Sequence, residues 1–165
     1  MTAKHRKTWR EKLADDKDLP KVVRLDAAAA KRWGGTTLAI AAPREIDALM
    51  RTVPPGRVTT IKELRSAIAK KHRAEAGCPI TTGIFSWIAA HAAEEAIAAG
   101  EKNPTPYWRT LKTGGEVNPK YPGGVNAQRR KLATEGHTFE RRGQRLFVCD
   151  HEAALHSLVP VRLGS

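Results

Sequence analysis

The sequence contains few cysteines and no long apolar run. Cys78 and Cys149 are its only cysteines, too few for the disulfide framework of a small secreted fold. The longest weakly polar run, Cys78 to Ala93, is interrupted by Ser86 and His91 and is too short and polar to cross a bilayer. No charged-then-apolar leader is recognisable at the start of the chain. We therefore expect a cytoplasmic protein that does not contact a membrane.

Acidic residues are scarce relative to basic ones. The 165 residues include 29 Lys and Arg against 17 Asp and Glu, which gives a formal net charge of +12 and a pI of about 10.2. This charge favours a polyanionic partner, with nucleic acid as the first candidate. The alternative is basic charge that only keeps the protein in solution. The length and the 41% of hydrophobic residues are those of one compact domain with extensions.

Metal-binding and reactive-thiol patterns are lacking as well. The six histidines form no recognisable ligand set with either cysteine, so we expect no metal and no cofactor. Cys78 lies just before Pro79, near an expected helix start, where the pKa of a thiol can fall. It has no identifiable base partner, and we interpret it as a small buried residue.

The basic residues are concentrated near the start of the chain. We predict a basic N-terminal extension over residues 1–36, a main domain over 37–150 and a C-terminal tail over 151–165. The ten basic residues of the first 35 are Lys4, Arg6, Lys7, Arg10, Lys12, Lys17, Lys21, Arg24, Lys31 and Arg32. Apolar residues such as Trp9 and Leu13 would let this extension dock onto a core.

Hydrophobic spacing and turn residues predict the elements of the main domain. The first expected elements are a strand over 36–40 and a helix over 43–50 with Pro43 as its first residue. A helix over 61–71 follows, capped by Thr60 with Glu63 at the capping-box position, and then a long helix that opens at Thr81 or Thr82 and closes at Gly100. The last elements are a basic helix over 125–135 and a hairpin whose strands flank Arg141-Arg142-Gly143. In the long helix, Ile84, Ile88, Ala92 and Ala96 are expected on the inner face.

Two helices joined by a Gly-containing loop, followed by a basic-tipped hairpin, are typical of a winged helix. The predicted fold is therefore mainly α with small β (α+β), a winged helix-turn-helix-like domain with a short C-terminal hairpin.

Three motifs occur in an order that resembles a known family. They are Val53-Pro54-Pro55-Gly56-Arg57-Val58, Pro106-Tyr107-Trp108-Arg109, and Pro122-Gly123-Gly124 followed by a helix that ends in Glu135-Gly136. Together they resemble the DNA-binding domain of the alkylguanine DNA alkyltransferases, the methylated-DNA-protein cysteine methyltransferases, and more closely the alkyltransferase-like proteins. The resemblance covers roughly Ile46 to Phe147.

The resemblance implies a winged helix-turn-helix that enters the minor groove of double-stranded DNA and flips an alkylated guanine into a pocket. True transferases move the alkyl group onto a cysteine activated by a neighbouring histidine. Here Tyr107 occupies the position of the cysteine and Trp108 that of the histidine. A phenol whose reference pKa is about 10 stays protonated at pH 7, so alkyl transfer to Tyr107 is not expected. The alkyltransferase-like proteins have Trp-His at this step, so Tyr-Trp is a further departure.

The resemblance also implies the site residues. The lesion pocket would be lined by Asn103, Pro106, Tyr107, Trp108 and Arg109. Arg109 is better explained as a structural hydrogen-bonding residue. The rings of Tyr107 and Trp108 could equally close the pocket. Thr60-Ile61 lies where the family has its Ser-Tyr step, and Trp87 lies near its intercalating arginine. Ile61 and Trp87 are therefore the predicted base-flipping or wedge residues, with a core role as the commoner outcome for Trp87.

Clustered cations near helix ends and at the hairpin tip would contact phosphates. The predicted DNA-binding residues are Arg57, Thr60, Lys62, Arg65, Lys112, Arg129, Arg130, Arg141 and Arg142.

The first hypothesis is thus a non-enzymatic, monomeric, nucleoid-associated DNA-binding protein that recognises alkylated or damaged bases and flags them for excision-repair proteins. The second is a general DNA-binding or regulatory winged-helix protein whose pocket has closed. The third is an active transferase that uses Tyr107 or Cys78.

Overall fold

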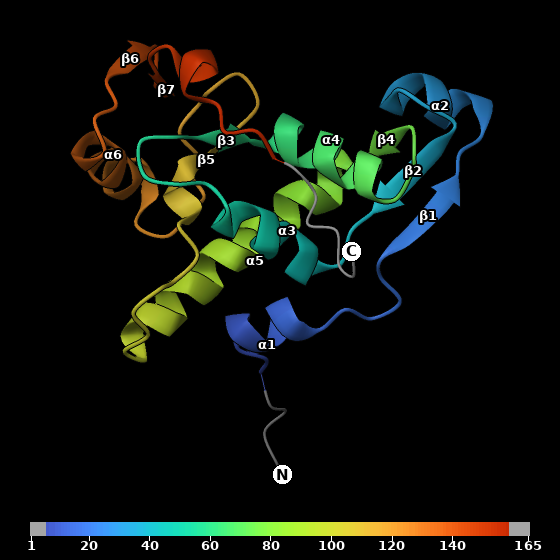
Figure 1. Ribbon diagram of the computed structural model, residues 1–165, viewed down its shortest axis with the longest axis horizontal. Coiled ribbons are helices and arrows are strands. Elements are labelled where there is room, and N and C mark those ends of the chain that lie inside the picture. Colours follow the sequence, from blue (N-terminus) through green and yellow to red (C-terminus); the bar gives the residue numbers. More distant parts are fainter. Residues whose placement is uncertain (1–5, 159–165) are drawn as a thin grey trace.

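The computed structural model describes residues 6–158 (Figure 1). Its α-helices are α1 (Trp9–Ala14), α2 (Ala27–Trp33), α3 (Pro43–Arg51), α4 (Ile61–Lys71), α5 (Pro79–Ala98) and α6 (Gly124–Thr134), and its 3-10 helices are η1 (Tyr107–Arg109) and η2 (His151–Ala154). The strands are β1 (Lys21–Arg24), β2 (Thr37–Ile40), β3 (Thr59–Thr60), β4 (Ala76–Gly77), β5 (Thr110–Leu111), β6 (Phe139–Arg142) and β7 (Arg145–Val148). Helices dominate and the strands are short, so the fold is α+β, as the sequence predicted.

The strands form small separate sheets. In the first, β2 pairs with β1 antiparallel and with β4 parallel. In the second, β3 and β5 pair in parallel. The third is the β6–β7 hairpin, in which Arg142 faces Arg145, so that only Gly143 and Gln144 form the turn. The sequence analysis put Arg141 and Arg142 in that turn. Gly143 has a φ of +63°, which suits a tight two-residue connection, and both arginines therefore lie in the strand.

Local chemistry explains where the main helices begin. Pro43 opens α3, and the backbone amide of Ala42 donates to Glu45 Oε1 at 2.9 Å. Thr60 caps α4, accepting a hydrogen bond from the Glu63 amide at 3.4 Å. The prediction that α5 opens at Thr81 or Thr82 is wrong, because Pro79 is its first residue and Cys78 Sγ accepts from the Thr81 amide at 3.5 Å.

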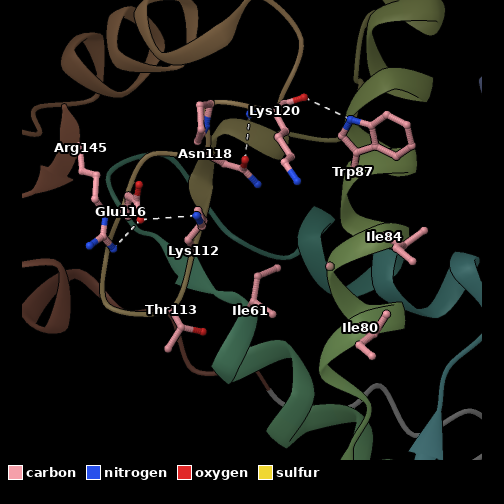
Figure 2. A pocket seen from close by; sticks show the side chains of 12 residues that line it. Ile61, Ile80, Ile84, Trp87, Lys112, Thr113, Glu116, Asn118, Lys120 and Arg145 are labelled. Atoms are coloured by element: carbon pink, nitrogen blue, oxygen red, sulfur yellow. Dashed lines mark hydrogen bonds and ion pairs between the residues drawn. The ribbon is translucent and has the colours of Figure 1, made fainter.

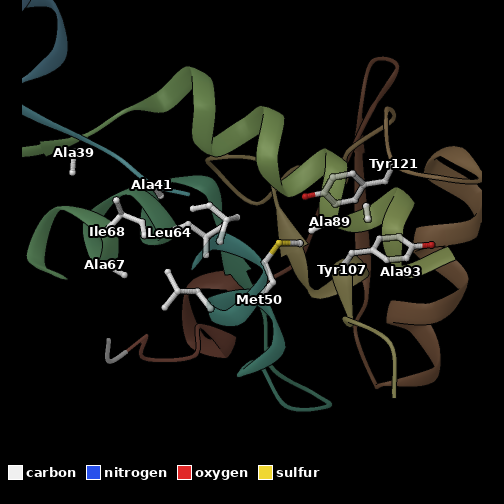
Figure 3. Close-up of a cluster of buried hydrophobic side chains, with 13 residues drawn as sticks. Ala39, Ala41, Met50, Leu64, Ala67, Ile68, Ala89, Ala93, Tyr107 and Tyr121 are labelled. Carbon is white, nitrogen blue, oxygen red and sulfur yellow. The ribbon is translucent and has the colours of Figure 1, made fainter. Parts of the chain in front are cut away.

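The largest core cluster lies between α3, α4 and α5 (Figure 3). Ile46, Met50, Leu64 and Ile68 are fully buried there. Helix α5 presents small residues to this core, including Ala89, Ala90 and Ala93, which allow its backbone to approach closely. The sequence analysis placed Ile84 on the inner face of α5, but Ile84 is exposed. Apolar residues surround this helix, so their spacing alone does not identify its buried face.

The N-terminal segment packs onto this core. Helix α1 lies against α5, where the Trp9 ring stacks on His91 with a centroid separation of 4.3 Å. Arg10 forms an ion pair with Glu101, and Asp16 forms one with Arg44 of α3. The described part of the predicted extension therefore docks onto the main domain. The boundaries at 36 and 150 stay predictions, and residues 1–5 and 159–165 of the two predicted end segments lie outside the described residues.

A second cluster joins the C-terminal hairpin to α6 and to the β3–β5 pair. Its buried members are Val58, Leu111, Val117, Leu132, Leu146 and Val148. This packing fixes the segment 112–120, which bridges to Phe147 of β7 through Glu116. The same segment faces the first half of α5. Within residues 6–158, no helix has both the length and the hydropathy that a bilayer crossing needs.

Candidate nucleic-acid interface

A groove of about 600 Å³ opens between the first half of α5, the start of α4 and the segment 112–120 (Figure 2). We call it the α5 groove. It is lined by Ile61, Ile80, Gly83, Ile84, Trp87, Lys112, Thr113, Glu116, Asn118, Pro119, Lys120 and Arg145. The two helices supply an apolar wall, and the segment 112–120 with Arg145 supplies a polar one. Three residues nominated from sequence, Ile61, Trp87 and Lys112, meet here.

Trp87 joins the two walls of the α5 groove. Its Nε1 donates to the Lys120 carbonyl oxygen at 3.1 Å. Behind it, the ring packs edge-on against Trp9 at 4.7 Å and against His91 at 5.1 Å between centroids. A ring held on both sides in this way is a fixed wall of the groove, which agrees with the core role weighed for Trp87 and not with a free wedge.

The polar wall is organised by the buried Glu116 carboxylate. Its Oε1 accepts from Arg145 at 2.8 Å and lies 3.6 Å from Lys112 Nζ. The hydrogen bond from Arg145 is the largest influence and lowers the pKa of Glu116 although burial raises it. Lys120 adds a further cation at the rim. With three cations and one carboxylate, the groove lining is formally positive at neutral pH.

Hydrogen bonds also hold the segment that carries Lys120. The backbone amide of Asn118 donates to Gln128 Oε1 at 2.9 Å, and the side-chain Oδ1 of Asn118 accepts from the backbone amide of Lys120 at 3.0 Å. Gln128 lies on α6 and is buried. The polar wall is therefore anchored to α6 rather than being a loose loop.

We define the Tyr107 site as Tyr107, Trp108 and Arg109 of η1 together with Glu94 and Glu135. The Tyr107 side chain is not open to solvent in this site, because it is buried and hydrogen-bonded. Tyr107 is 1% exposed, and its hydroxyl donates to Glu94 Oε1 at 2.6 Å. Its ring lies edge-on to Trp108, with 5.5 Å between centroids. Burial, and secondly the hydrogen bond to Glu94, raise the pKa of Tyr107 well above that of a free phenol. The phenol therefore stays protonated and is no nucleophile at neutral pH.

Glu135 fastens the rest of the Tyr107 site to α6. Its carboxylate accepts from Arg109 Nε at 2.9 Å, from an Arg109 terminal nitrogen at 2.8 Å and from Trp108 Nε1 at 3.0 Å. The other terminal nitrogen of Arg109 donates to the Val53 carbonyl oxygen at 2.8 Å. Burial would raise the pKa of Glu135, but the bonds from Arg109 and Trp108 outweigh it and lower the pKa. Arg109 is thus the structural hydrogen-bonding residue that the sequence favoured.

The predicted lesion pocket is not open at Tyr107. None of its five residues lines the α5 groove. Pro106 and Tyr107 are buried, while Asn103 is exposed and its carbonyl oxygen accepts from Arg51 at 3.2 Å. The buried tyrosine ring occupies this position, and the open volume is instead the α5 groove, which Tyr107 does not line.

Most of the predicted DNA-binding residues are exposed. These are Arg57, Lys62, Lys112, Arg129, Arg130, Arg141 and Arg142. Two others serve the fold in this structure. The buried Thr60 hydroxyl caps α4, and Arg65 Nε donates to the Gly77 carbonyl oxygen at 3.0 Å. Both side chains already have hydrogen-bond partners within the protein, so neither is free to bind a phosphate in this structure.

Sequence reasoning missed most of the α5 groove. Ile84 was assigned to the inner face of a helix that is apolar on several sides, and Ile80 lay before the predicted start of that helix, so neither was predicted to line a groove. Asn118 and Lys120 lie directly before the Pro-Gly-Gly turn, which was the one local signal for them. Glu116 and Arg145 meet only through the tertiary fold. Among residues 6–158, no cluster of His, Cys, Asp and Glu is arranged to hold a metal ion.

Comparison with known proteins gives a likeness of fold. No protein-family model matches the chain, and no curated protein sequence matches it. Among solved structures, S. pombe Atl1 in complex with damaged DNA containing O6-carboxymethylguanine is similar, with a TM-score of 0.50 and 15% sequence identity. The match covers 69% of this chain and 93% of the Atl1 chain. The protein therefore shares an α+β fold with Atl1.

Proposed function

We propose that this protein is a non-enzymatic DNA-binding protein that recognises alkylated or otherwise damaged bases. In this proposal it enters the minor groove of double-stranded DNA, and the α5 groove receives the flipped nucleotide. One observation carries the proposal: an open, formally positive groove is present in a fold similar to that of Atl1, while the Tyr107 position itself is buried.

The charge and size of the α5 groove support nucleic-acid binding. Lys112, Lys120 and Arg145 outnumber Glu116 at the groove, and the whole chain has a formal net charge of +12. Cations that neutralise phosphates release counterions and so favour binding. A volume of about 600 Å³ lies within the usual range for ligand sites, so the groove is large enough in volume for a base with a substituent. A damaged base costs less to unstack than an intact one, which gives selectivity before any chemistry.

We expect no alkyl transfer, because the chain supplies no thiolate where the resemblance implies one. Tyr107 is buried and its pKa is raised, and Cys78 is buried at the start of α5, where its sulfur caps the helix. The protein would then bind the lesion without repairing it, and excision-repair proteins would act on the lesion that it marks. A single copy of the chain contributes the whole groove.

One observation favours a second candidate, a general DNA-binding or regulatory winged-helix protein. Tyr107 is 1% exposed, so the position that corresponds to the reactive centre is closed. If the α5 groove serves only to contact the DNA backbone, binding would be strongly salt-dependent and indifferent to lesions.

Fluorescence anisotropy with two matched duplexes separates the candidates. One duplex carries a single O6-alkylguanine and the other carries guanine at the same position, at one fixed salt concentration. We expect tighter binding to the alkylated duplex. Equal affinity would replace the proposal by the second candidate, and absence of binding to either duplex would contradict both. A stoichiometric gain of one alkyl mass on the protein would contradict the non-enzymatic part.

A further inference from the structure

Helix α5 exposes two isoleucines at the edge of the α5 groove. The large hydrophobic residues exposed among residues 6–158 are Val22, Ile80, Ile84 and Ile97. Ile80 is 58% exposed and Ile84 is 46% exposed, and they lie four residues apart on the first half of the helix. Both line the groove (Figure 2). We call this pair the Ile80–Ile84 ridge.

The ridge belongs to the uncovered side of α5. The opposite side is buried through small residues such as Ala89 and Ala93, which pack against the core. Gly83 lies next to Ile84, and a Cβ added there would meet nothing within 4 Å. The backbone between the two isoleucines is therefore bare, and the two side chains stand above it.

Cations lie across the α5 groove from this apolar ridge. Lys112, Lys120 and Arg145 lie across the α5 groove, and Lys62 is exposed on the first turn of α4. The segment from Ala74 to Gly100 itself contains no Lys or Arg. An apolar ridge flanked by cations matches a partner whose outside is anionic and whose inside is apolar. Duplex DNA has this construction, because its phosphates enclose stacked bases.

We infer that the Ile80–Ile84 ridge is a wedge that enters between stacked bases of the duplex. The inference rests on the proposed function and names the part of α5 that opens the helix. Ile84 lies one turn from Trp87, so it takes the space beside the base that the groove receives. Ile80 lies one turn further towards the start of the helix and contacts the neighbouring base. Apolar side chains inserted in this way unstack a base step and kink the duplex.

The wedge also explains how a helix without cations takes part in DNA binding. The cations around it would hold the phosphates, and the ridge would supply the apolar contact at the opened step. Trp87, the residue nominated from sequence as the wedge, is fixed by Lys120 and Trp9 and stays in the wall.

The test uses the full chain and a duplex with 2-aminopurine beside a single O6-alkylguanine. The fluorescence of 2-aminopurine rises when it is unstacked. We expect the wild-type protein to raise this fluorescence and the Ile80→Ala/Ile84→Ala variant to lose most of the rise. Affinity measured by anisotropy on the same duplex should fall less, by about 3-fold, because phosphate contacts dominate binding. Ile84→Leu, which keeps an apolar side chain, should retain the signal.

Ile97→Ala is the matched control, since Ile97 is a 38% exposed isoleucine on the same helix and is not among the residues that line the groove. It should behave as the wild type. If the double variant keeps the full rise, or if Ile97→Ala loses it equally, the wedge is wrong while the proposed function stands. If the wild type does not bind the duplex, the proposed function itself fails. If light scattering shows that wild type is a dimer and the double variant a monomer, the ridge is a protein interface and the inference is overturned.

Discussion

The Tyr107 site and the α5 groove have opposite construction. In the Tyr107 site, Tyr107 is 1% exposed, and Glu135 accepts hydrogen bonds from both Arg109 and Trp108. In the α5 groove, Ile84 is 46% exposed and cations outnumber the single carboxylate. The first arrangement stabilises the fold, and the second leaves an open surface at which we propose that DNA binds. Where the resemblance puts a reactive centre, this chain has a buried, hydrogen-bonded cluster, and none of the residues of that cluster lines the open groove.

The largest expected effect tests the structural role of the Tyr107 site. Glu135→Ala should lower the free energy of unfolding by about 3 kcal/mol, because it leaves the Arg109 guanidinium buried without its carboxylate. The side chains of Arg109 and Glu135 are only 12% and 13% exposed, so solvent compensates little. Urea denaturation monitored by circular dichroism measures the change.

Arg130→Ala on the exposed side of α6 is the control, and it should change stability by no more than about 0.5 kcal/mol. If Glu135→Ala lowered the free energy of unfolding no more than this control does, the Tyr107 site would not stabilise the fold.

The second prediction concerns the charge of the α5 groove. Lys112→Ala/Lys120→Ala should reduce the slope of log affinity against log salt by about 2, one unit for each phosphate contact removed. Salt-series anisotropy on an unmodified duplex measures it. Lys31→Ala/Arg32→Ala, which removes the same charge from exposed positions on α2, should leave the slope nearly unchanged. Equal losses in both variants would mean that binding is spread over the basic surface and that the groove has no special part.

The third prediction concerns the support behind Trp87. Trp9→Ala removes a ring that packs edge-on to Trp87 and stacks on His91, and it should lower the free energy of unfolding by about 1 kcal/mol. Lesion affinity should fall with it, because the groove wall loses its backing. Lys7→Ala removes only an exposed ion pair with Asp15 and should have a smaller effect. Unchanged lesion affinity in Trp9→Ala would mean that α1 does not support the wall of the α5 groove.

The smallest effect is the response to acid. The pKa of Glu135 and that of Glu116 are lowered in the folded protein, so the stability they contribute is present above their unfolded pKa of about 4.3. It is lost as pH falls through the lower folded values. Urea unfolding between pH 7 and pH 3 should therefore show declining stability, with a weaker decline in Glu135→Gln. An identical decline in that variant would remove Glu135 from the acid response.

Local chemistry made much of the fold predictable. Pro43, Thr60 and Gly100 mark helix ends through properties of single residues, and the sequence located α3 and α4 to within about a residue. Helix α1 was not predicted, although Thr8 and Glu11 form a capping box at its start. Strand β1 was not predicted because it depends on tertiary contacts. Trp9 packs on α5, and Val23 pairs with Leu38 of β2.

The candidate site was less predictable for the same reason. Arg109 was identified as structural, but its partner Glu135 lies 26 residues away and no local pattern joins them. Ile84 was assigned to the core because α5 is apolar on several sides. The polar wall of the α5 groove depends on Glu116 meeting Arg145 across 29 residues, which only the packing of the hairpin establishes.

Photo-crosslinking tests most directly where a recognised base lies. A duplex with a single 6-thioguanine at the lesion position, irradiated in complex with the protein and mapped by mass spectrometry, reports the residues that touch that base. We expect crosslinks to residues that line the α5 groove, such as Trp87 and Lys120, and none to Tyr107. Crosslinks to Tyr107, or only to residues remote from the groove, would contradict it.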